Sequence, residues 1–227
     1  MSGAALPRIG GPEEFARAFR VSPETVARLE AYAASLALWQ RRINLVSPTT
    51  LPDVWHRHFA DSAQLLALAP SESRTWIDIG SGAGFPGLVV AILLADRPAP
   101  RPRMTLVESD QRKAAFLGEV VRRTGLAALL PVDILCARIE SDATRGMLAT
   151  ADVVSARALA PLVKLLELAS PLLAPDGRGL FLKGRDVKAE IATAARSFEF
   201  SYDLVSSRTE SEAGIVVMHG PARRTRG

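Results

Sequence analysis

The sequence predicts an α/β fold: a seven-stranded, mainly parallel sheet covered by helices and preceded by an N-terminal helical extension. Two observations lead to this prediction. After Pro70, short β-branched or apolar runs alternate with helical patterns, which is typical of βαβ units around a parallel sheet. Before Pro70, apolar residues recur at helical spacing. We therefore expect a helical extension over residues 1–70, a sheet domain over 71–220 and a basic tail over 221–227.

Two helices account for most of the extension. Ser22 and Pro23 supply an N-cap and a first helical residue. Apolar residues follow at near-helical spacing, so residues 23–43 are predicted to form one amphipathic helix, and residues 53–68 a second. The segment before them, residues 1–12, contains glycine and proline and is expected to be frayed.

The sheet domain follows in regular order. The expected parallel strands are Thr75–Ile79, Met104–Glu108, Val132–Leu135, Asp152–Ser155 and Gly179–Lys183. The expected helices between them are Gly87–Ala95, Gln111–Arg123, Ile139–Leu148 and Pro161–Leu173. Ser201–Ser206 and Gly214–His219 have no helical pattern between them, so they are predicted to close the sheet as a hairpin. The tail, PARRTRG, is expected to be disordered.

Composition limits the class of protein. With 48% hydrophobic and 23% charged residues, the 227-residue chain has the composition of an ordinary globular protein. Its longest apolar run, Leu88–Ala95, is far shorter than the roughly 20 residues of a membrane span. One cysteine, Cys136, excludes an intrachain disulfide and favours a reducing compartment. We expect a cytoplasmic monomer without membrane contact. The net charge of +4 permits a polyanionic partner without requiring one.

A glycine loop at residues 76–87, WIDIGSGAGFPG, fits two cofactor patterns. Residues 82–87 fit the G-x-G-x-x-G dinucleotide fingerprint, and residues 78–84 fit the acidic-x-G-x-G-x-G loop that holds S-adenosylmethionine. The loop joins the first strand to the first helix, where open α/β sheets bind ligands. Side chains there would keep the ligand away from the backbone. We therefore assign to a cofactor site Asp78, Gly80, Gly82, Gly84 and Phe85, although Phe85 could also belong to the core.

Glu108 is a second cofactor candidate. It ends the second strand, 21 residues beyond Gly87, where a carboxylate can accept hydrogen bonds from both ribose hydroxyls of NAD or of S-adenosylmethionine. Single-domain reductases commonly place a lysine four residues after a tyrosine, and neither Tyr32 nor Tyr202 has one there. The chain beyond the sheet is too short for the substrate domain of a two-domain dehydrogenase. These observations favour S-adenosylmethionine and a methyltransferase.

A set of short motifs is spread along nearly the whole chain. They are Asn44-Leu45-Val46, Arg57-His58-Phe59-Ala60-Asp61-Ser62, Asp78 to Gly87, Val107-Glu108-Ser109 before Arg112-Lys113, Arg138-Ile139-Glu140, Ser155-Ala156-Arg157-Ala158 and Leu182-Lys183-Gly184. In these motifs the chain resembles the bacterial small-subunit ribosomal RNA guanine-N7 methyltransferases, long called glucose-inhibited division protein B. Two features depart from the family pattern: Ala156 separates the serine from the arginine, and residues 96–103, DRPAPRPR, look like a small insertion.

The resemblance implies a Rossmann-like class I methyltransferase fold, S-adenosylmethionine as the cofactor, and a guanine N7 in 16S ribosomal RNA, free or in the ribosomal particle, as the target. It also implies that Arg157 contacts cofactor or RNA and that Ile139 and Glu140 bracket the adenine. Arg57 and His58 would border the methyl site. Two further basic residues could bind phosphate or could simply be solvated, namely Arg138 and Lys183.

Local geometry adds two expectations for residues 56–61. On a helix, Arg57 and His58 would reach Asp61 at i+4 and i+3. His56 and His58 would point to nearly opposite sides, so they could not share a metal ion.

The chemistry of guanine N7 asks little of the protein. The atom has a lone pair in the ring plane and no proton to remove, so positioning supplies much of the catalysis and no general base is expected. The Asp/Asn-Pro-Pro-aromatic motif of exocyclic-amine methylation is absent, and Cys136 is expected to be a small buried residue rather than a nucleophile. Two alternatives stay open at this point: a methyltransferase acting on another RNA or on protein, and a catalytically silent module that binds NAD or RNA.

Overall fold

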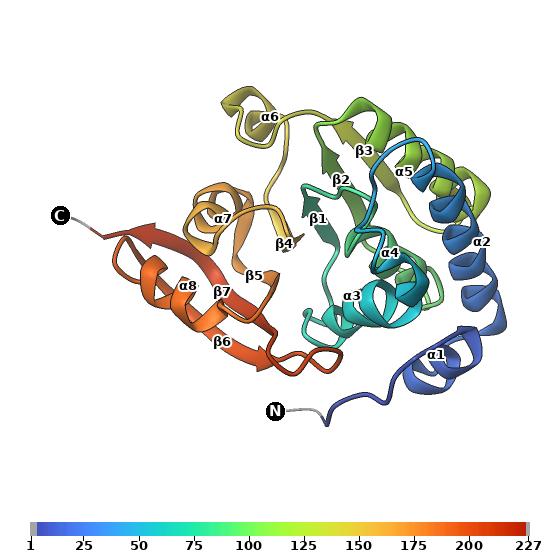
Figure 1. Cartoon of the computed structure of the whole chain (residues 1–227). Coiled ribbons are helices and arrows are strands. Elements are labelled where there is room, and N and C mark those ends of the chain that lie inside the picture. The colour runs from blue at the N-terminus through green and yellow to red at the C-terminus, as the bar shows by residue number, and fades with distance from the viewer. Residues whose placement is uncertain (1–3, 226–227) are drawn as a thin grey trace.

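A seven-stranded sheet forms the centre of the computed structural model, which describes residues 4–225 (Figure 1). The strands are β1 (Thr75–Ile79), β2 (Arg103–Glu108), β3 (Val132–Cys136), β4 (Ala151–Arg157), β5 (Leu173–Lys183), β6 (Phe198–Ser206) and β7 (Gly214–Arg224). Their order is β3-β2-β1-β4-β5-β7-β6, with β1 to β5 parallel and β7 antiparallel to both neighbours. The predicted α/β sheet with a closing hairpin is confirmed.

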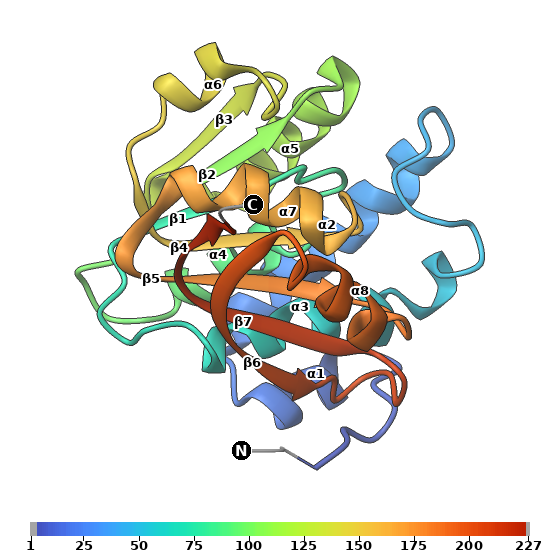
Figure 2. The same ribbon diagram turned by 90° about the vertical axis from the view of Figure 1, so that its left-hand side faces the viewer.

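Helices cover both faces of this sheet. They are α1 (Pro12–Phe19), α2 (Pro23–Gln40), α3 (Asp61–Ala63), α4 (Gly87–Ala95), α5 (Gln111–Arg123), α6 (Asp142–Gly146), α7 (Leu162–Ala169) and α8 (Val187–Ala194). Five single-turn segments accompany them: the 3₁₀ helices η1 (Leu51–Asp53), η3 (Gln64–Ala67), η4 (Leu126–Ala128) and η5 (Ser170–Leu172), and the π-helix η2 (Trp55–Ala60). The helices α7 and α8 lie on the opposite face from α2, α4 and α5 (Figures 1 and 2).

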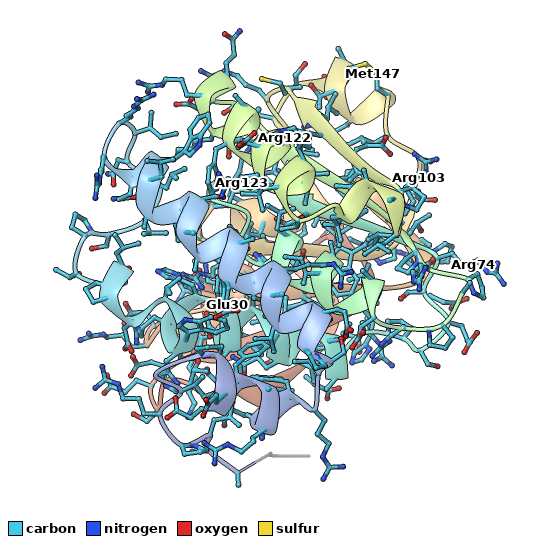
Figure 3. All side chains as sticks on the ribbon, turned by 90° about the vertical axis from the view of Figure 1, so that its right-hand side faces the viewer. Glu30, Arg74, Arg103, Arg122, Arg123 and Met147 are labelled. Carbon is cyan, nitrogen blue, oxygen red and sulfur yellow. The ribbon has the colours of Figure 1, made fainter. Side chains whose placement is uncertain are left out.

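The extension shares its apolar core with the sheet domain. All nine residues of α4 are buried, because α4 lies between the sheet and the helices α2 and α3. Leu29 and Leu36 of α2 belong to the same apolar cluster as Leu88 and Leu106. Figure 3 shows α2 lying lengthwise on the outside of this layer, with Glu30 pointing outward. Because this core is common to both parts, the extension contributes directly to the stability of the sheet domain that carries the glycine loop.

The predicted helix over residues 23–43 is three residues shorter at its C-terminus, ending at Gln40. At its start, Ser22 Oγ accepts a hydrogen bond from Thr25 N at 3.2 Å, as an N-cap should. At its end, Gln40 Oε1 accepts hydrogen bonds from the backbone N–H groups of Leu45 and Val46, each at 3.0 Å. These two hydrogen bonds to the Gln40 side chain fix the loop that follows the end of the helix.

The second predicted helix, residues 53–68, is an irregular helical segment. It passes from η1 through the π-helix η2 and the single turn of α3 to η3. A π-helix bonds residue i to i+5 and is frequent at functional sites. Two short helices escaped prediction, α1 and α8; the predicted helix over residues 139–148 shrinks to α6, and β5 begins earlier than predicted, at Leu173.

Both ends of the described chain are more ordered than predicted. Ile9 is 1% exposed, and the Leu6 backbone N–H donates to Arg208 O at 2.8 Å, so the frayed N-terminus is wrong for residues 4–12. The disordered tail is wrong for residues 221–224, which extend β7. Arg224 is opposite Phe198 of β6, lies over its ring and pairs with Glu167. Residues 1–3 and 226–227 lie outside the described part of the chain. The first described residues run beside the segment that follows β6, whereas α1 packs against α2 (Figure 1).

Of the helices within residues 4–225, none combines the length and the apolar character that a membrane crossing requires.

Candidate functional site

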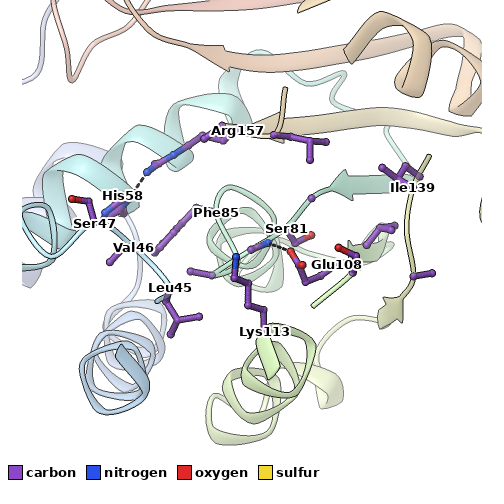
Figure 4. Close-up of a pocket in the computed structure, with 18 of the residues that line it drawn as sticks. Leu45, Val46, Ser47, His58, Ser81, Phe85, Glu108, Lys113, Ile139 and Arg157 are labelled. Carbon is purple, nitrogen blue, oxygen red and sulfur yellow. Dashed lines mark hydrogen bonds between the residues drawn. The ribbon is translucent and has the colours of Figure 1, made fainter. Parts of the chain in front are cut away.

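A cavity of about 490 Å³ opens at the carboxyl ends of β1, β2 and β4. Its wall comes from the glycine loop, the ends of β2 and β4, the segment after β3 and the loop after α2. Figure 4 shows Glu108 and Phe85 in the middle of this wall, Ile139 on one side, and His58 and Arg157 on the other. The cavity therefore lies where open α/β sheets bind ligands.

The glycines of the loop serve different purposes. Gly80 and Gly82 line the cavity. Gly82 has a φ of 57°, and a Cβ there would have no neighbour closer than Gly80 O at 3.8 Å, so the open space beside it belongs to the cavity. Gly84, with φ of 92°, does not line the cavity: a Cβ there would lie 2.5 Å from the Tyr32 hydroxyl oxygen. Gly82 therefore leaves room for a ligand, and Gly84 leaves room for α2.

Asp78 lies beneath the loop and does not line the cavity, contrary to its assignment as a cofactor ligand. Its Oδ1 accepts a hydrogen bond from Ser155 Oγ at 2.5 Å, and Ser155 Oγ in turn accepts from Trp76 Nε1 at 2.8 Å. Its Oδ2 has no side-chain or backbone donor at hydrogen-bonding geometry among residues 4–225. Burial raises the pKa of Asp78 to about 6, against the opposing effect of the Ser155 hydrogen bond. Asp78 thus supports the loop from below.

Glu108 is fixed at the floor of the cavity, where the sequence places it. Its Oε2 accepts a hydrogen bond from Gly82 N at 2.7 Å and its Oε1 accepts one from Asp110 N at 2.8 Å. A carboxylate offers about four acceptor positions. Each oxygen of Glu108 therefore keeps capacity for one more donor on the cavity side, which suits a pair of vicinal hydroxyls.

Ile139 and Glu140 line the opposite side of the same cavity. Ile139 is buried and Glu140 is exposed. Arg145 of α6 holds both in place, because its Nη1 donates to Ile139 O at 2.9 Å and to Glu140 O at 2.8 Å. An apolar side chain beside a polar one at this position suits a planar heterocycle.

Phe85 lies in an aromatic cluster with His58 and Tyr32. The His58 ring stacks on it with centroids 4.7 Å apart, and the Tyr32 ring with centroids 5.4 Å apart. The Arg157 guanidinium carbon lies 5.5 Å from the Phe85 ring centre, within the range of a cation–π contact. Phe85 therefore belongs both to the core and to the cavity wall.

Arg157 is bound on three sides by the irregular helical segment. Its Nη1 donates to Asp61 Oδ2 at 3.0 Å and to Arg57 O at 3.1 Å, and its Nη2 bonds His58 Nδ1. A guanidinium has no acceptor, so His58 Nδ1 accepts and the ring proton is on Nε2, which donates to Thr50 Oγ1 at 2.9 Å. Burial, followed by the charge of Arg157, lowers the pKa of His58 to about 3. His58 is therefore neutral.

The expected contacts of Arg57 and His58 with Asp61 are wrong. Arg57 pairs with Glu210, and Asp61 binds Arg157. Asp61 Oδ1 also accepts a hydrogen bond from Thr209 Oγ1 at 2.8 Å. The π-helical turns change the i+3 and i+4 geometry, and residues distant in sequence satisfy the same groups.

A second cavity of about 260 Å³ adjoins the first. The two share four lining residues, namely Thr50, His58, Arg157 and Ala158. The second cavity is lined by three cationic side chains (Arg57, Arg157 and Lys183) and three acidic ones (Asp61, Glu190 and Glu210). Its charges are paired: Lys183 Nζ lies 2.7 Å from Glu190 Oε2 and donates to Ala160 O at 3.0 Å.

Two residues that the sequence analysis singled out, Arg138 and Cys136, lie outside these cavities. Arg138 is exposed and lines neither of them. Cys136 is exposed at the end of the edge strand β3, so its predicted burial is wrong; β3 has no further strand beyond it to cover this residue. Within residues 4–225, no three His, Cys, Asp or Glu side chains converge in a way that could hold a metal ion.

Several lining residues were not singled out from the sequence. Leu45, Val46 and Lys113 line the first cavity and stand in motifs that carry the family resemblance, so that signal could have found them. No local sequence pattern identifies Leu159, which lines the cavity, or Tyr32, whose hydroxyl donates to Ala83 O in the glycine loop. The places of both depend on long-range packing.

The chain is similar in sequence to one group of proteins. Residues 25–216 match the GidB family model, described as rRNA small subunit methyltransferase G. The chain is 47% identical over 218 residues to Ribosomal RNA small subunit methyltransferase G of Parvibaculum lavamentivorans, covering 95% of this chain and 93% of the relative. It is 51% identical over 197 residues to the protein of that name from Methylobacterium nodulans, with 86% and 89% covered.

Solved structures share the fold at low sequence identity. A methyltransferase from Geobacter sulfurreducens matches with a TM-score of 0.57 and 13% identity, covering 96% of this chain and 100% of that one. Fibrillarin from Aeropyrum pernix, solved with bound S-adenosyl-L-methionine, matches with a TM-score of 0.53 and 20% identity, covering 72% and 75%. These matches confirm the predicted Rossmann-like methyltransferase fold.

Proposed function

The chain belongs to the rRNA small subunit methyltransferase G family, and we propose that it methylates N7 of a guanine in small-subunit (16S) ribosomal RNA, using S-adenosylmethionine. The family supports the enzyme class, the methyl donor and the RNA substrate. The alternatives of an NAD-binding protein and of a silent RNA-binding module have no support from it.

The first cavity is the proposed donor site. The open space beside Gly82, where a Cβ would meet no close neighbour, is the space that a ligand close to the backbone needs. Glu108 would bind the two ribose hydroxyls, and Ile139 and Glu140 would bracket the adenine. Gly80, Gly82 and Phe85 would border the amino-acid part. When bound there, S-adenosylmethionine supplies a methyl group on a positively charged sulfur.

Glu108 is the single observation that carries this assignment. Its carboxylate is already oriented by Gly82 N at 2.7 Å and by Asp110 N at 2.8 Å, yet it faces the cavity with acceptor capacity left. A charged acceptor fixed in this way loses little freedom on binding vicinal hydroxyls, so binding is favoured.

The second cavity is the proposed site for the target guanine. It adjoins the donor cavity along His58, Arg157 and Ala158, so a base seated there would present its edge to the donor site. Guanine N7 has no proton, and the neighbouring groups are not free to act as bases: His58 Nδ1 accepts from Arg157, and Asp61 is ion-paired. These residues would therefore hold and orient the base and exclude water.

Charge balance fits the same assignment. Methylation of N7 leaves the guanine cationic. If Arg57 and Lys183 turned from Glu210 and Glu190 to RNA phosphates, these two carboxylates of the second cavity would offset that charge. Arg157 would act by position and charge at the boundary between the two cavities. Arg138, exposed beside Ile139, would reach RNA outside them.

We further propose that the enzyme acts as a cytoplasmic monomer on ribosomal RNA or on the ribosomal particle. Both cavities are lined within one chain, so one copy would carry donor and target sites together. The net charge of +4 is compatible with an RNA partner.

Two measurements test the proposal. Small ribosomal subunits from a strain lacking the gene are incubated with the purified chain and radiolabelled S-adenosylmethionine, and the labelled nucleotide is mapped by mass spectrometry; we expect 7-methylguanine at one position. Calorimetry with S-adenosylmethionine and with NAD should give binding of the first alone. Label in protein or in another RNA, or binding of NAD alone, would refute the assignment.

A further inference from the structure

Tyr32 connects the N-terminal extension to the glycine loop. It lies in α2, its side chain is fully buried, and its hydroxyl donates a hydrogen bond to the backbone carbonyl of Ala83, which is 51 residues away. A buried hydroxyl is costly without such a partner. Burial also raises the pKa of Tyr32 well above its ordinary value, so the hydroxyl keeps its proton and remains a donor.

The contact falls on the glycine-rich part of the cavity wall. Gly80, Gly82 and Gly84 all have positive φ angles, and a glycine-rich segment has more conformations to lose on ordering than any other. Three hydrogen bonds to the ends of β1 and β2 hold Ser81 and Gly82, and Gly84 N donates to Ser81 O within the loop. The hydrogen bond from Tyr32 holds the loop from the other side, at Ala83.

Tyr32 also stacks beside the loop. Its ring lies 5.4 Å from that of Phe85, with the planes 20° apart. Ala83 and Phe85 both line the donor cavity, whereas Tyr32 and Gly84 do not. Tyr32 therefore touches the two wall residues on either side of Gly84 from behind. The absence of a side chain at Gly84 is what lets the hydroxyl approach, since a Cβ would lie 2.5 Å from it.

We propose that Tyr32 is a positioning residue that holds residues 82–85 in the shape that binds the methyl donor. The inference rests on the proposed function, because it takes the first cavity as the donor site. Tyr32 would not contact the donor. By ordering the loop before the donor binds, Tyr32 would lower the free-energy cost of donor binding. Loss of the hydroxyl should therefore weaken donor binding while leaving the chemical step intact.

The variant Tyr32→Phe tests this in the full chain. It keeps the ring beside Phe85, Phe59 and Phe116 and removes only the hydroxyl. We expect donor affinity, measured by calorimetry with S-adenosylmethionine, to fall about 5- to 20-fold, the range for one lost buried hydrogen bond. KM for the donor should rise by the same factor. The turnover number at saturating donor and KM for the RNA should stay within about twofold.

Ser35→Ala is the matched control. Ser35 is buried on the same helix, and its hydroxyl donates to Ala31 O within that helix, so the variant also loses a buried hydroxyl. It should bind the donor as the parent chain does. Amide hydrogen exchange without donor gives a second readout: residues 81–88 should exchange faster in Tyr32→Phe and at the parental rate in Ser35→Ala.

The outcomes separate the two proposals. Parental donor affinity in Tyr32→Phe would overturn the positioning role, and so would equal losses in Tyr32→Phe and Ser35→Ala, which would indicate general destabilisation. If Glu108→Ala binds the donor poorly while Tyr32→Phe gives either of these results, only the positioning role of Tyr32 fails and the assignment of the donor site is kept. If Glu108→Ala binds as the parent does, the donor site is misplaced and both proposals fail.

Discussion

The Gly82 backbone N–H donates to Glu108 Oε2 at 2.7 Å, so the loop and the carboxylate on the two sides of the donor cavity are joined directly. This bond spans the ends of β1 and β2, which pair in parallel from Thr75 opposite Arg103 onward. The floor of the cavity is therefore tied to the sheet that carries it, and substitutions on either side of the bond should have separable effects.

Glu108→Ala should weaken donor binding by roughly 1.5–3 kcal/mol, because a charged acceptor of two hydrogen bonds is lost. Glu108→Gln should fall between parent and alanine variant, since an amide N–H₂ would face Gly82 N or Asp110 N, both of them donors. Calorimetry measures both. Glu30→Ala, at an exposed carboxylate on the outer side of α2, is the control and should bind normally. Parental affinity in a folded Glu108→Ala would contradict the assignment.

Gly82→Val should reduce donor affinity by at least about a hundredfold, because two branched methyl groups would enter the ligand space and the left-handed backbone would be strained. Gly125→Val is matched to it: Gly125 has φ of 64°, open space around a Cβ, and a place after α5 away from the cavity. Both variants should lose similar stability to urea, but only Gly82→Val should lose the donor. Equal donor binding in the two would mean that residues 80–87 form only a structural turn.

Arg157→Lys should reduce the methylation rate roughly tenfold, and Arg157→Ala roughly a hundredfold. Lysine keeps the charge beside Asp61 but cannot also satisfy Arg57 O and His58 Nδ1 in the geometry of the guanidinium. Alanine leaves Asp61 without its cation. Single-turnover assays measure the rates, with Arg123→Ala on the exposed face of α5 as the control. A fully active Arg157→Ala would remove this residue from the site.

The single-turnover rate with both substrates bound should be nearly flat between about pH 7 and 9, because no group with a pKa in that range takes part. His58, with its pKa lowered to about 3 by burial, stays neutral throughout. A bell-shaped profile would indicate an acid or base in the chemical step. The target would then be an atom that must lose a proton, and not guanine N7.

Asp78 predicts a pH dependence of stability. Its folded pKa of about 6 lies above the ordinary 3.8, so the folded state binds the proton more tightly than the unfolded state. The free energy of unfolding should therefore fall as pH rises from about 4 to 6, by about 3 kcal/mol for this group, and the loss is complete above pH 6. In urea titrations the free energy of unfolding should fall over this pH range by that amount more in the parent than in Asp78→Asn, even if the two proteins differ in stability at every pH. Parallel pH curves would show that Asp78 is not buried as a carboxylate.

The parts of the fold that the sequence predicts are those governed by local pattern. The strands alternate with helices in a rhythm that periodicity reveals, and the glycine loop and Glu108 follow their strands at fixed spacing. The family resemblance adds Ile139, Glu140 and Arg157, whose ligand contacts stay predictions, as does the domain boundary at residue 70. Asp78 shows the limit: it stands in the motif, yet its side chain is buried, is bound by Ser155 and does not line the cavity.

The features that the sequence could not predict depend on distant partners. Gln40 ends α2 by binding the backbone of Leu45 and Val46, which no helix rule foresees. Asp61 binds Arg157 and Thr209 instead of its helical neighbours Arg57 and His58. The continuation of β7 to Arg224 requires β6 beside it. Each of these errors is a tertiary contact that overrides a local preference.

The contacts of the irregular helical segment have a consequence for how the protein is made. Asp61 binds Thr209, which follows it by 148 residues. At the ~5–20 residues per second of translation, the partner emerges roughly 7–30 s later. During that interval the nascent chain cannot complete the second cavity, whose lining includes both Asp61 and Thr209. A chain truncated before Thr209 would carry the whole donor loop and still lack β7, so the edge of β5 would present unpaired backbone groups to chaperones and proteases.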